Sequence, residues 1–316
     1  MDAALNMRTV AGMALALGLI VMSLAGCASP VDPLPTSLAK EHSIRAGGLD
    51  RTYRLFVPQP AGTEPLPVVF AFHGGGMTSQ SMAEWTGIYQ IAARERFMVV
   101  YPDGTRVGPF GGVWNVGSPT PQTQAEKEGV DDVEFISVLL DRLKREYRID
   151  PRRIYATGVS LGGMFSYYLA CSMSKTFAAV AVVAGSMTVG DCAAEAPVAI
   201  WAIHGLDDTF VTVTGARARH TAPGHVWAPV SRGLEFWSRR NGCQEVRTES
   251  FRGTGASCWT YGPCSTGRPV EFCSVEGGHH WPGQVQPMEW QRWTGQGISD
   301  FPASERIWAF FKSNPR

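Results

Sequence analysis

The sequence predicts a doubly wound α/β domain, because short apolar runs alternate with amphipathic helical segments along most of the chain. The runs expected to be strands are residues 68–72, 97–101, 153–158, 178–185, 197–205 and 269–277. Continuous apolar runs of this length suit a mostly parallel sheet that is buried on both faces and flanked by helices. We find no internal repeat, and no linker after residue 50 divides the body. One domain over residues 45–316 is therefore the simplest interpretation.

Two of the intervening segments have clear helical character. Apolar side chains recur at helical spacing in residues 131–147, and Asp131 or Asp132 is the expected N-cap. Residues 304–314 are expected to form a last helix that turns Trp308 and Phe311 inward. Helices of this kind would cover the faces of the predicted sheet.

Composition and charge exclude some classes of partner. The chain has 316 residues, of which 44% are hydrophobic, so it is long enough to bury a core. Lys and Arg number 28, as do Asp and Glu, and like charges do not cluster in a run. Nothing therefore predicts a nucleic-acid tract or a polybasic membrane patch.

The N-terminal sequence predicts an export signal. An apolar run follows Arg8, and its end, residues 24–27 (Leu-Ala-Gly-Cys), resembles a bacterial lipobox. The resemblance implies a signal peptide over residues 1–27, cleavage before Cys27 and lipidation of its thiol, followed by a linker over residues 28–44. An uncleaved membrane helix fits less well, since the run is short and a Pro/Ser-rich stretch follows it. The body is expected to lie outside the cytoplasm, membrane-anchored or secreted.

Cysteine usage agrees with that location. Six cysteines remain besides Cys27, an even number for an oxidising compartment, so three disulfides are expected. We predict a bridge between Cys171 and Cys192 and two bridges within residues 243–273. A zinc site is the competing interpretation, but the spacings are irregular and contain no C-x-x-C.

A G-x-S-x-G motif lies between an expected strand and an expected helix, the context in which this motif carries a nucleophile. Residues 158–162 (Gly-Val-Ser-Leu-Gly) connect an expected strand with an expected helix, so the turn would expose the Ser160 hydroxyl at the helix N-terminus. A serine hydroxyl is a poor nucleophile until a base removes its proton, and the base needs an orienting carboxylate. The motif therefore predicts a nucleophile whose partners follow it in the chain.

Two pairs of candidates follow in the order that an α/β-hydrolase triad requires. Asp207 and Asp208 come after one strand, and His279 and His280 come after the last. We assign Asp208 as the acid because it lies further into its loop, and His279 as the base because it directly follows the glycine pair. Asp207 and His280 are expected to be solvated or turn-capping groups.

The oxyanion needs preorganised backbone donors. One is expected to be the Leu161 amide, directly after the nucleophile. The other is expected in the His-Gly-Gly-Gly loop, residues 73–76, where Gly75 or Gly76 can donate and Gly75 is preferred. His73 and His204 are expected to make structural hydrogen bonds rather than to act in catalysis.

Taken together, the motifs resemble a known family. They are HGGG (73–76), YPDG (101–104), WN (114–115), DDVEFI (131–136), GVSLGG (158–163), HGLDD (204–208), NGC (241–243) and GGHHWPG (277–283). In this order, over about residues 45–312, the chain resembles the polyhydroxybutyrate depolymerase and feruloyl esterase family, in its LpqC-like lipoprotein branch. The resemblance implies an α/β-hydrolase fold, an acyl-serine intermediate and the roles given to Ser160, Asp208 and His279. Asp207 departs from the family, which usually has a small residue there.

The resemblance implies a carboxylic ester substrate, either feruloyl- or acetyl-type esters or short hydroxyalkanoate polyesters, and no cofactor. Trp281 and Trp114 are the expected aromatic contacts to substrate, with packing as the alternative, and Trp290 and Trp293 lie in a less familiar region. Two other functions remain open. One is a metal-dependent hydrolase that uses the cluster His204, Asp207, Asp208, His279 and His280. The other is a non-catalytic binding lipoprotein.

Overall fold

The computed structural model describes residues 35–60, 62–107, 111–215, 226–284 and 301–316. Residues Leu34–Arg316 form one compact unit. The predicted signal peptide and Cys27 lie outside the described residues, as do Trp290 and Trp293. Within the described residues, no helix has both the length and the apolar character needed to cross a membrane.

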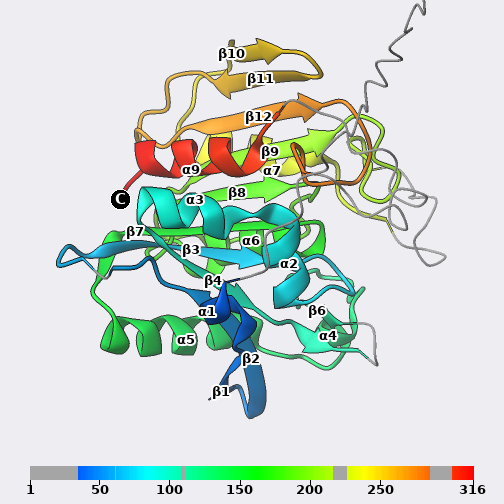
Figure 1. Ribbon diagram of the computed structural model, residues 1–316. Coiled ribbons are helices and arrows are strands. Elements are labelled where there is room, and N and C mark those ends of the chain that lie inside the picture. The colour runs from blue at the N-terminus through cyan, green and yellow to red at the C-terminus, as the bar shows by residue number, and fades with distance from the viewer. Residues whose placement is uncertain (1–34, 61, 108–110, 216–225, 285–300) are drawn as a thin grey trace, which may run out of the picture. The chain divides into compact units, whose positions relative to one another are not determined.

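A ten-stranded sheet runs through the described part of the chain (Figure 1). In spatial order its strands are β1 (His42–Ala46), β2 (Leu49–Phe56), β4 (Met98–Pro102), β3 (Leu66–Phe72), β7 (Ile149–Val159), β8 (Ala179–Val183), β9 (Ala199–Gly205), β12 (Val270–Val275), β11 (Ala256–Tyr261) and β10 (Arg247–Gly253). The strands from β4 to β12 in this order are parallel, and antiparallel strands extend both edges. The predicted α/β class and its six strands are confirmed.

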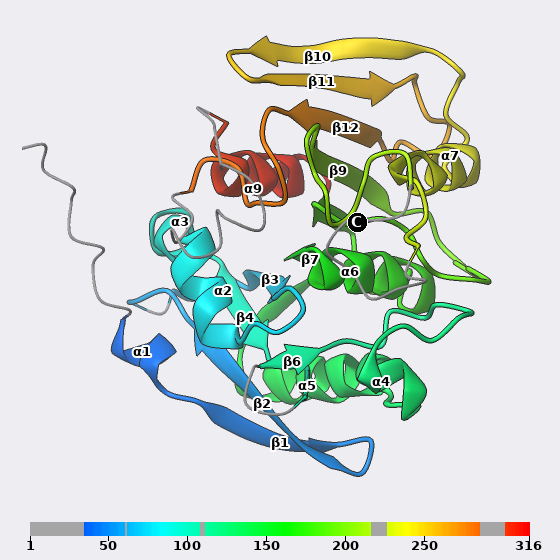
Figure 2. The same cartoon turned by 90° about the vertical axis from the view of Figure 1, so that its right-hand side faces the viewer.

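Helices cover both faces of the sheet, as Figures 1 and 2 show. They are α1 (Thr36–Ala39), α2 (Ser79–Thr86), α3 (Ile88–Glu95), α4 (Gln124–Lys127), α5 (Asp132–Glu146), α6 (Leu161–Ser172), α7 (Val230–Arg240) and α9 (Ala303–Ser313), and a small hairpin joins β5 (Thr105–Arg106) to β6 (Gly112–Val113). Alternate strand residues serve opposite cores. Phe70 and Phe72 join the core under α5, α6 and α7, whereas Val69 and Ala71 join the core under α2, α3 and α9.

The start of α5 shows which of two adjacent aspartates caps the helix. The Asp131 side chain accepts a hydrogen bond from the Glu134 amide, as an N-cap does. Asp132 is buried instead, where its carboxylate lies 2.6 Å from the Arg51 guanidinium and accepts a bond from the Asn115 amide. Asp131 therefore caps the start of the helix, and its neighbour Asp132 ties the helix to strand β2.

Three disulfides close the second half of the chain, as predicted. They join Cys171 to Cys192, Cys243 to Cys264 and Cys258 to Cys273. The last of these links directly opposed residues of β11 and β12. The antiparallel ribbon of β10 and β11 is therefore attached covalently to the last parallel strand.

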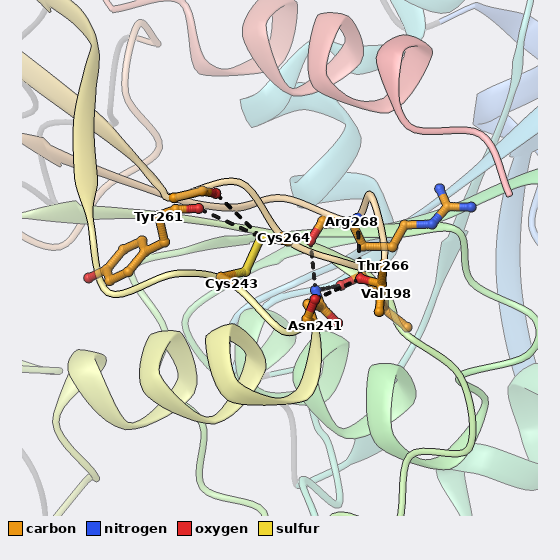
Figure 3. The surroundings of a disulfide bond; sticks show 8 residues. Val198, Asn241, Cys243, Tyr261, Cys264, Thr266 and Arg268 are labelled. Carbon is orange, nitrogen blue, oxygen red and sulfur yellow. Dashed lines mark hydrogen bonds between the residues drawn. A yellow bond between two sulfur atoms is a disulfide. The ribbon is translucent and has the colours of Figure 1, made fainter.

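Hydrogen bonds of Asn241 lie beside the Cys243–Cys264 bridge (Figure 3). The Asn241 side-chain amide donates to the carbonyls of Val198 and Arg268, at 2.8 and 3.0 Å. Val198 directly precedes β9, so Asn241 fastens the end of α7 to the amino-terminal end of that strand. The opposite, carboxyl end of β9 leads to the aspartates of the predicted site.

Candidate active site

Three of the parallel strands deliver the predicted catalytic side chains. Ser160 directly follows β7, Asp208 lies three residues beyond the end of β9, and His279 lies four residues beyond the end of β12. The sheet order is β7-β8-β9-β12, and these strands are parallel. Their carboxyl ends therefore lie at one edge of the sheet, where ligands bind in folds of this class.

Ser160 occupies a strained turn between strand and helix. Its backbone has φ 56° and ψ −122°, a conformation that non-glycine residues rarely adopt. Two backbone hydrogen bonds hold it: its amide donates to the Val183 carbonyl, and its carbonyl accepts from the Met164 amide, both at 2.9 Å. The side chain is half-buried. The turn thus presents a hydroxyl at the first turn of α6, as a nucleophile elbow does.

The two glycines of the motif are explained by close backbone approach. A methyl group on Gly162 would lie 2.2 Å from the Phe72 carbonyl oxygen and 2.6 Å from that of His73. One on Gly158 would lie 2.4 Å from the backbone of Gly162 itself. Helix α6 therefore begins directly against the end of β3, which carries the His-Gly-Gly-Gly loop.

We expect Gly162→Ala to lower the free energy of unfolding by more than about 3 kcal/mol, because backbone atoms cannot move aside as side chains can. Gly190→Ala is the matched control, since its added methyl would meet only Pro119 at 3.4 Å and should cost less than about 0.5 kcal/mol. Urea unfolding followed by circular dichroism measures both. Equal stabilities for the two variants would contradict this account of the motif.

The Asp208 carboxylate is saturated with contacts. Its Oδ1 atom accepts hydrogen bonds from the amides of Phe210 and Val211, both at 2.9 Å. Its Oδ2 atom lies 2.7 Å from Nδ1 of His279 and 3.2 Å from Nε2 of His204. The side chain is fully buried. A carboxylate with this many donors has one preferred orientation.

Opposing influences act on the pKa of Asp208. Burial alone would raise this pKa, but the charge of His279 and the donors on both histidines lower it well below its ordinary value. The carboxylate therefore stays ionised at neutral pH. An ionised acid beside Nδ1 holds the imidazole proton on that nitrogen and leaves Nε2 as the basic atom.

The structure brings His279, and not His280, against Asp208. Nδ1 of His280 instead bonds to the Gly278 carbonyl at 2.8 Å, and the residue is buried. The Asp207 amide donates to the Gly277 carbonyl at 3.0 Å, and the residue is exposed. Of each adjacent pair predicted from the sequence, only the preferred member joins the arrangement.

Phe210 is a part of the site that was not predicted from the sequence. Its ring stacks on the His279 imidazole, with centroids 5.3 Å apart and planes inclined by 29°. The position two residues after the acid carries no pattern that would have revealed this contact. Phe210 is half-buried, so it also contributes apolar surface beside the base.

His73 fixes the shape of the predicted oxyanion loop. Its Nε2 accepts a hydrogen bond from the Gly104 amide at 2.9 Å, which leaves the proton on Nδ1 to bond the Gly74 carbonyl at 2.8 Å. Burial lowers the pKa of His73, so the ring is neutral. The side chain is fully buried and reaches no solvent. A structural role, as expected, accounts for all of these contacts.

The loop lies directly beside the nucleophile. A methyl group on Gly74 would lie 3.5 Å from Cβ of Ser160. The Gly76 amide is occupied, because it donates to the Gly112 carbonyl at 2.9 Å. Among the described residues, no hydrogen bond takes up the amides of Gly75 or Leu161. Gly75 rather than Gly76 therefore retains the free donor that an oxyanion would need.

The expectation that Trp114 and Trp281 contact substrate is wrong. Both side chains are fully buried. The Trp114 indole donates to the His73 carbonyl at 2.9 Å, and that of Trp281 donates to the Ser304 hydroxyl at 2.9 Å. An indole without exposed surface cannot stack on a ligand, so these two side chains support the loops around the site instead.

The proposed five-residue metal cluster does not form. His204 and His279 both adjoin Asp208, but the hydrogen bonds described above for Asp207 and His280 involve the backbone of residues 277 and 278 instead. Within the described ranges, no group of three or more His, Cys, Asp or Glu side chains could hold a metal ion. The structure instead shows a hydrogen-bonded pair, Asp208 and His279, at the same edge of the sheet as the Ser160 turn and the amides of Gly75 and Leu161.

Comparisons with known proteins find related esterases. Residues 45–255 match the Esterase family. Feruloyl esterase C of Emericella nidulans is 29% identical over 270 residues, 83% of each chain. The bifunctional acetylxylan esterase/xylanase of Neocallimastix patriciarum is 25% identical over 263 residues, which are 82% of this chain but 35% of that enzyme.

A solved structure shares the fold. The acetyl xylan esterase from Aspergillus awamori aligns with a TM-score of 0.57 at 17% identity, covering 80% of this chain and 98% of that one. The family match spans more than half of the chain and includes Ser160, Asp208 and the His-Gly-Gly-Gly loop. The protein is thus a carboxylic ester hydrolase with the α/β-hydrolase fold, and it belongs to the Esterase family.

Proposed function

We propose that the protein is a serine esterase that hydrolyses feruloyl- or acetyl-type esters through an acyl-serine intermediate. The names of its relatives, feruloyl esterase and acetylxylan esterase, support this substrate class. The observation that carries the mechanism is the Asp208–His279 hydrogen bond at the sheet edge that also bears the Ser160 turn. Short hydroxyalkanoate esters are the second substrate class to be compared.

In the proposed reaction, the Ser160 hydroxyl oxygen attacks the ester carbonyl carbon while His279 takes the hydroxyl proton on Nε2. The amides of Gly75 and Leu161 bind the oxyanion that forms. Asp208 balances the charge of the imidazolium through Nδ1. Collapse of the tetrahedral intermediate breaks the bond to the alcohol, which leaves with the proton from His279. Water then attacks the acyl-serine by the same steps and releases the acid.

We also propose that the enzyme works outside the cytoplasm, tethered through lipidated Cys27. Three disulfides support an oxidising compartment. The lipobox-like stretch before Cys27 supports the tether. Mass spectrometry of the protein purified from membranes would reveal a lipidated N-terminal cysteine, and a chain that still begins at Met1 would contradict cleavage.

The test of the catalytic proposal is to trap the acyl-enzyme. Purified full chain is mixed with methyl ferulate, p-nitrophenyl acetate or a hydroxybutyrate oligomer, quenched early in turnover and digested for mass spectrometry. We expect the acyl group on the peptide that contains Ser160, and the ester with the highest kcat/KM defines the substrate class. A fluorophosphonate should label the same peptide and stop turnover.

Two outcomes would contradict the proposal. Activity that survives complete fluorophosphonate labelling but is lost on adding a chelator would favour the metal-dependent alternative. Binding of these esters without release of acid, by protein with native circular dichroism, would favour a non-catalytic binding function.

A further inference from the structure

The acid of the proposed triad has a second histidine beside it. His204 is the penultimate residue of β9 and is fully buried, and its Nε2 atom lies 3.2 Å from Oδ2 of Asp208. The same Nε2 atom lies 2.6 Å from the Val211 carbonyl oxygen and must donate its proton there, because a carbonyl can only accept. Nδ1 of His204 is buried and has no hydrogen-bond partner among the described residues. Nε2 of His204 therefore carries a proton.

His204 and Asp208 both bind the backbone of Val211, on either side of its Cα atom. His204 binds the Val211 carbonyl, while Oδ1 of Asp208 binds the Val211 amide at 2.9 Å. The Val211 side chain is itself buried in the core. Residues 208–211 are thus held by one hydrogen bond from the end of β9 and one from the acid, and both bonds end on Val211.

We infer that His204 is a positioning residue for the acid of the triad. Its bond to Val211 holds the acid turn in place, and its N–H edge near Oδ2 favours the ionised carboxylate in the orientation that faces His279. His204 touches no reacting atom in this arrangement. It acts through Asp208 on His279, so the inference rests on the proposed function of these two residues.

The consequence for catalysis concerns kcat rather than substrate binding. When His279 becomes an imidazolium in the transition state, its stabilisation depends on the distance and alignment of the Asp208 carboxylate. Without the hydrogen bond from His204 to the Val211 carbonyl, the Asp208 carboxylate can adopt other orientations. The ground-state ester does not need that alignment, so KM should change little.

The experiment compares His204→Leu, His204→Gln and a matched control, Asn241→Leu. Leucine removes the donor, whereas the glutamine amide nitrogen can reach the place of Nε2 and donate to Val211. Asn241 is likewise fully buried and likewise donates to backbone carbonyls, but at the opposite end of β9 (Figure 3). Loss of its bonds should destabilise the fold without disturbing the acid.

We expect His204→Leu to lower kcat by about 10- to 100-fold with KM within about twofold of the wild type. His204→Gln should recover most of the loss, and Asn241→Leu should keep kcat per folded molecule while its melting temperature falls. Active protein is counted by fluorophosphonate titration, so unfolded molecules do not enter kcat.

A proton NMR signal can distinguish a role of His204 in positioning Asp208 from a role in stabilising the fold. The proton between Nδ1 of His279 and Asp208 should give a far-downfield proton NMR signal in the wild type, in His204→Gln and in Asn241→Leu. In His204→Leu we expect this signal to shift upfield or broaden away. If His204→Leu is too unstable for NMR, the signal of His204→Gln and the comparison of kcat values test the inference.

The inference is overturned if His204→Leu retains wild-type kcat, if its only change is a rise in KM, or if Asn241→Leu loses kcat equally. Failure of the proposed function gives a different result. If the proposed function fails, Ser160→Ala remains active. If only the inference about His204 fails, Ser160→Ala loses activity and only the His204 variants differ from what we expect.

Discussion

Ser160→Ala is expected to lower kcat for ester hydrolysis by about 10⁶-fold, the largest effect of any single substitution in this protein. The change removes the nucleophile and leaves the loop amides, His279 and Asp208 in place. Residual turnover should remain above that of water, since the oxyanion donors still act. Initial rates of acid release from methyl ferulate, with protein concentration fixed by absorbance, measure the loss.

A serine at the neighbouring strand end provides the control. Ser186 lies three residues beyond β8, is fully buried, and has no hydrogen-bond partner for its hydroxyl among the described residues. Ser186→Ala should therefore keep its activity. Equal losses in the two variants would show that a serine hydroxyl at this edge matters for folding rather than for attack, and an active Ser160→Ala enzyme would end the acyl-serine mechanism.

Asp208→Asn is expected to lower kcat by about 10⁴-fold. The amide keeps the shape of the side chain but carries no charge and can present N–H groups to Nδ1 of His279. The imidazole then takes the wrong tautomer, with its proton on the nitrogen that should accept from Ser160. Steady-state rates at pH 8 measure the loss, and unfolding curves check that the turn survives.

Asp207→Asn is the matched control for the acid. Asp207 is exposed and contributes its backbone amide, which asparagine retains, so the variant should stay within about twofold of the wild-type kcat. Asp207 stands where the family that the sequence resembles usually has a small residue, so its side chain is worth testing as an alternative acid. A larger loss in Asp207→Asn than in Asp208→Asn would transfer the role of the acid to Asp207.

The part of the fold that could be predicted is the part whose physics is local. Strands β3, β4, β8 and β9 are buried on both faces, so they appear in the sequence as nearly unbroken apolar runs. The Ser160 turn was predictable because the close approach of Gly162 to Phe72 excludes any side chain there. Asp208 and His279 were predictable because parallel strands bring their carboxyl ends to one edge.

The rest depended on tertiary contacts that leave no periodic pattern. Strand β10 is mostly exposed and polar, so neither alternation nor an apolar run marks it. Trp114 and Trp281 follow strand ends and precede turns, a place where an indole can face either a ligand or the core. The carbonyls and hydroxyls that accept their N–H groups come from distant parts of the chain. The contact of His204 with the Asp208 turn likewise exists only in the folded loop.

The disulfides have a consequence for the order of events during synthesis. All six bridged cysteines follow Ser160, and the bridged pairs are only 21, 21 and 15 residues apart. A chain that emerges N-terminus first presents Cys171 and Cys192 before Cys243, so this pair can close before the other four bridged cysteines appear. Such short loops also close at a small entropic cost.

The other two bridges are interleaved. Cys243 meets Cys258 before its true partner Cys264 has emerged, and Cys273 comes last. Oxidation in order of appearance therefore produces a wrong pair, which only thiol–disulfide exchange can correct. Maturation of the strand that leads to His279 should consequently depend on a disulfide isomerase, whereas the segment that carries the nucleophile needs only an oxidant.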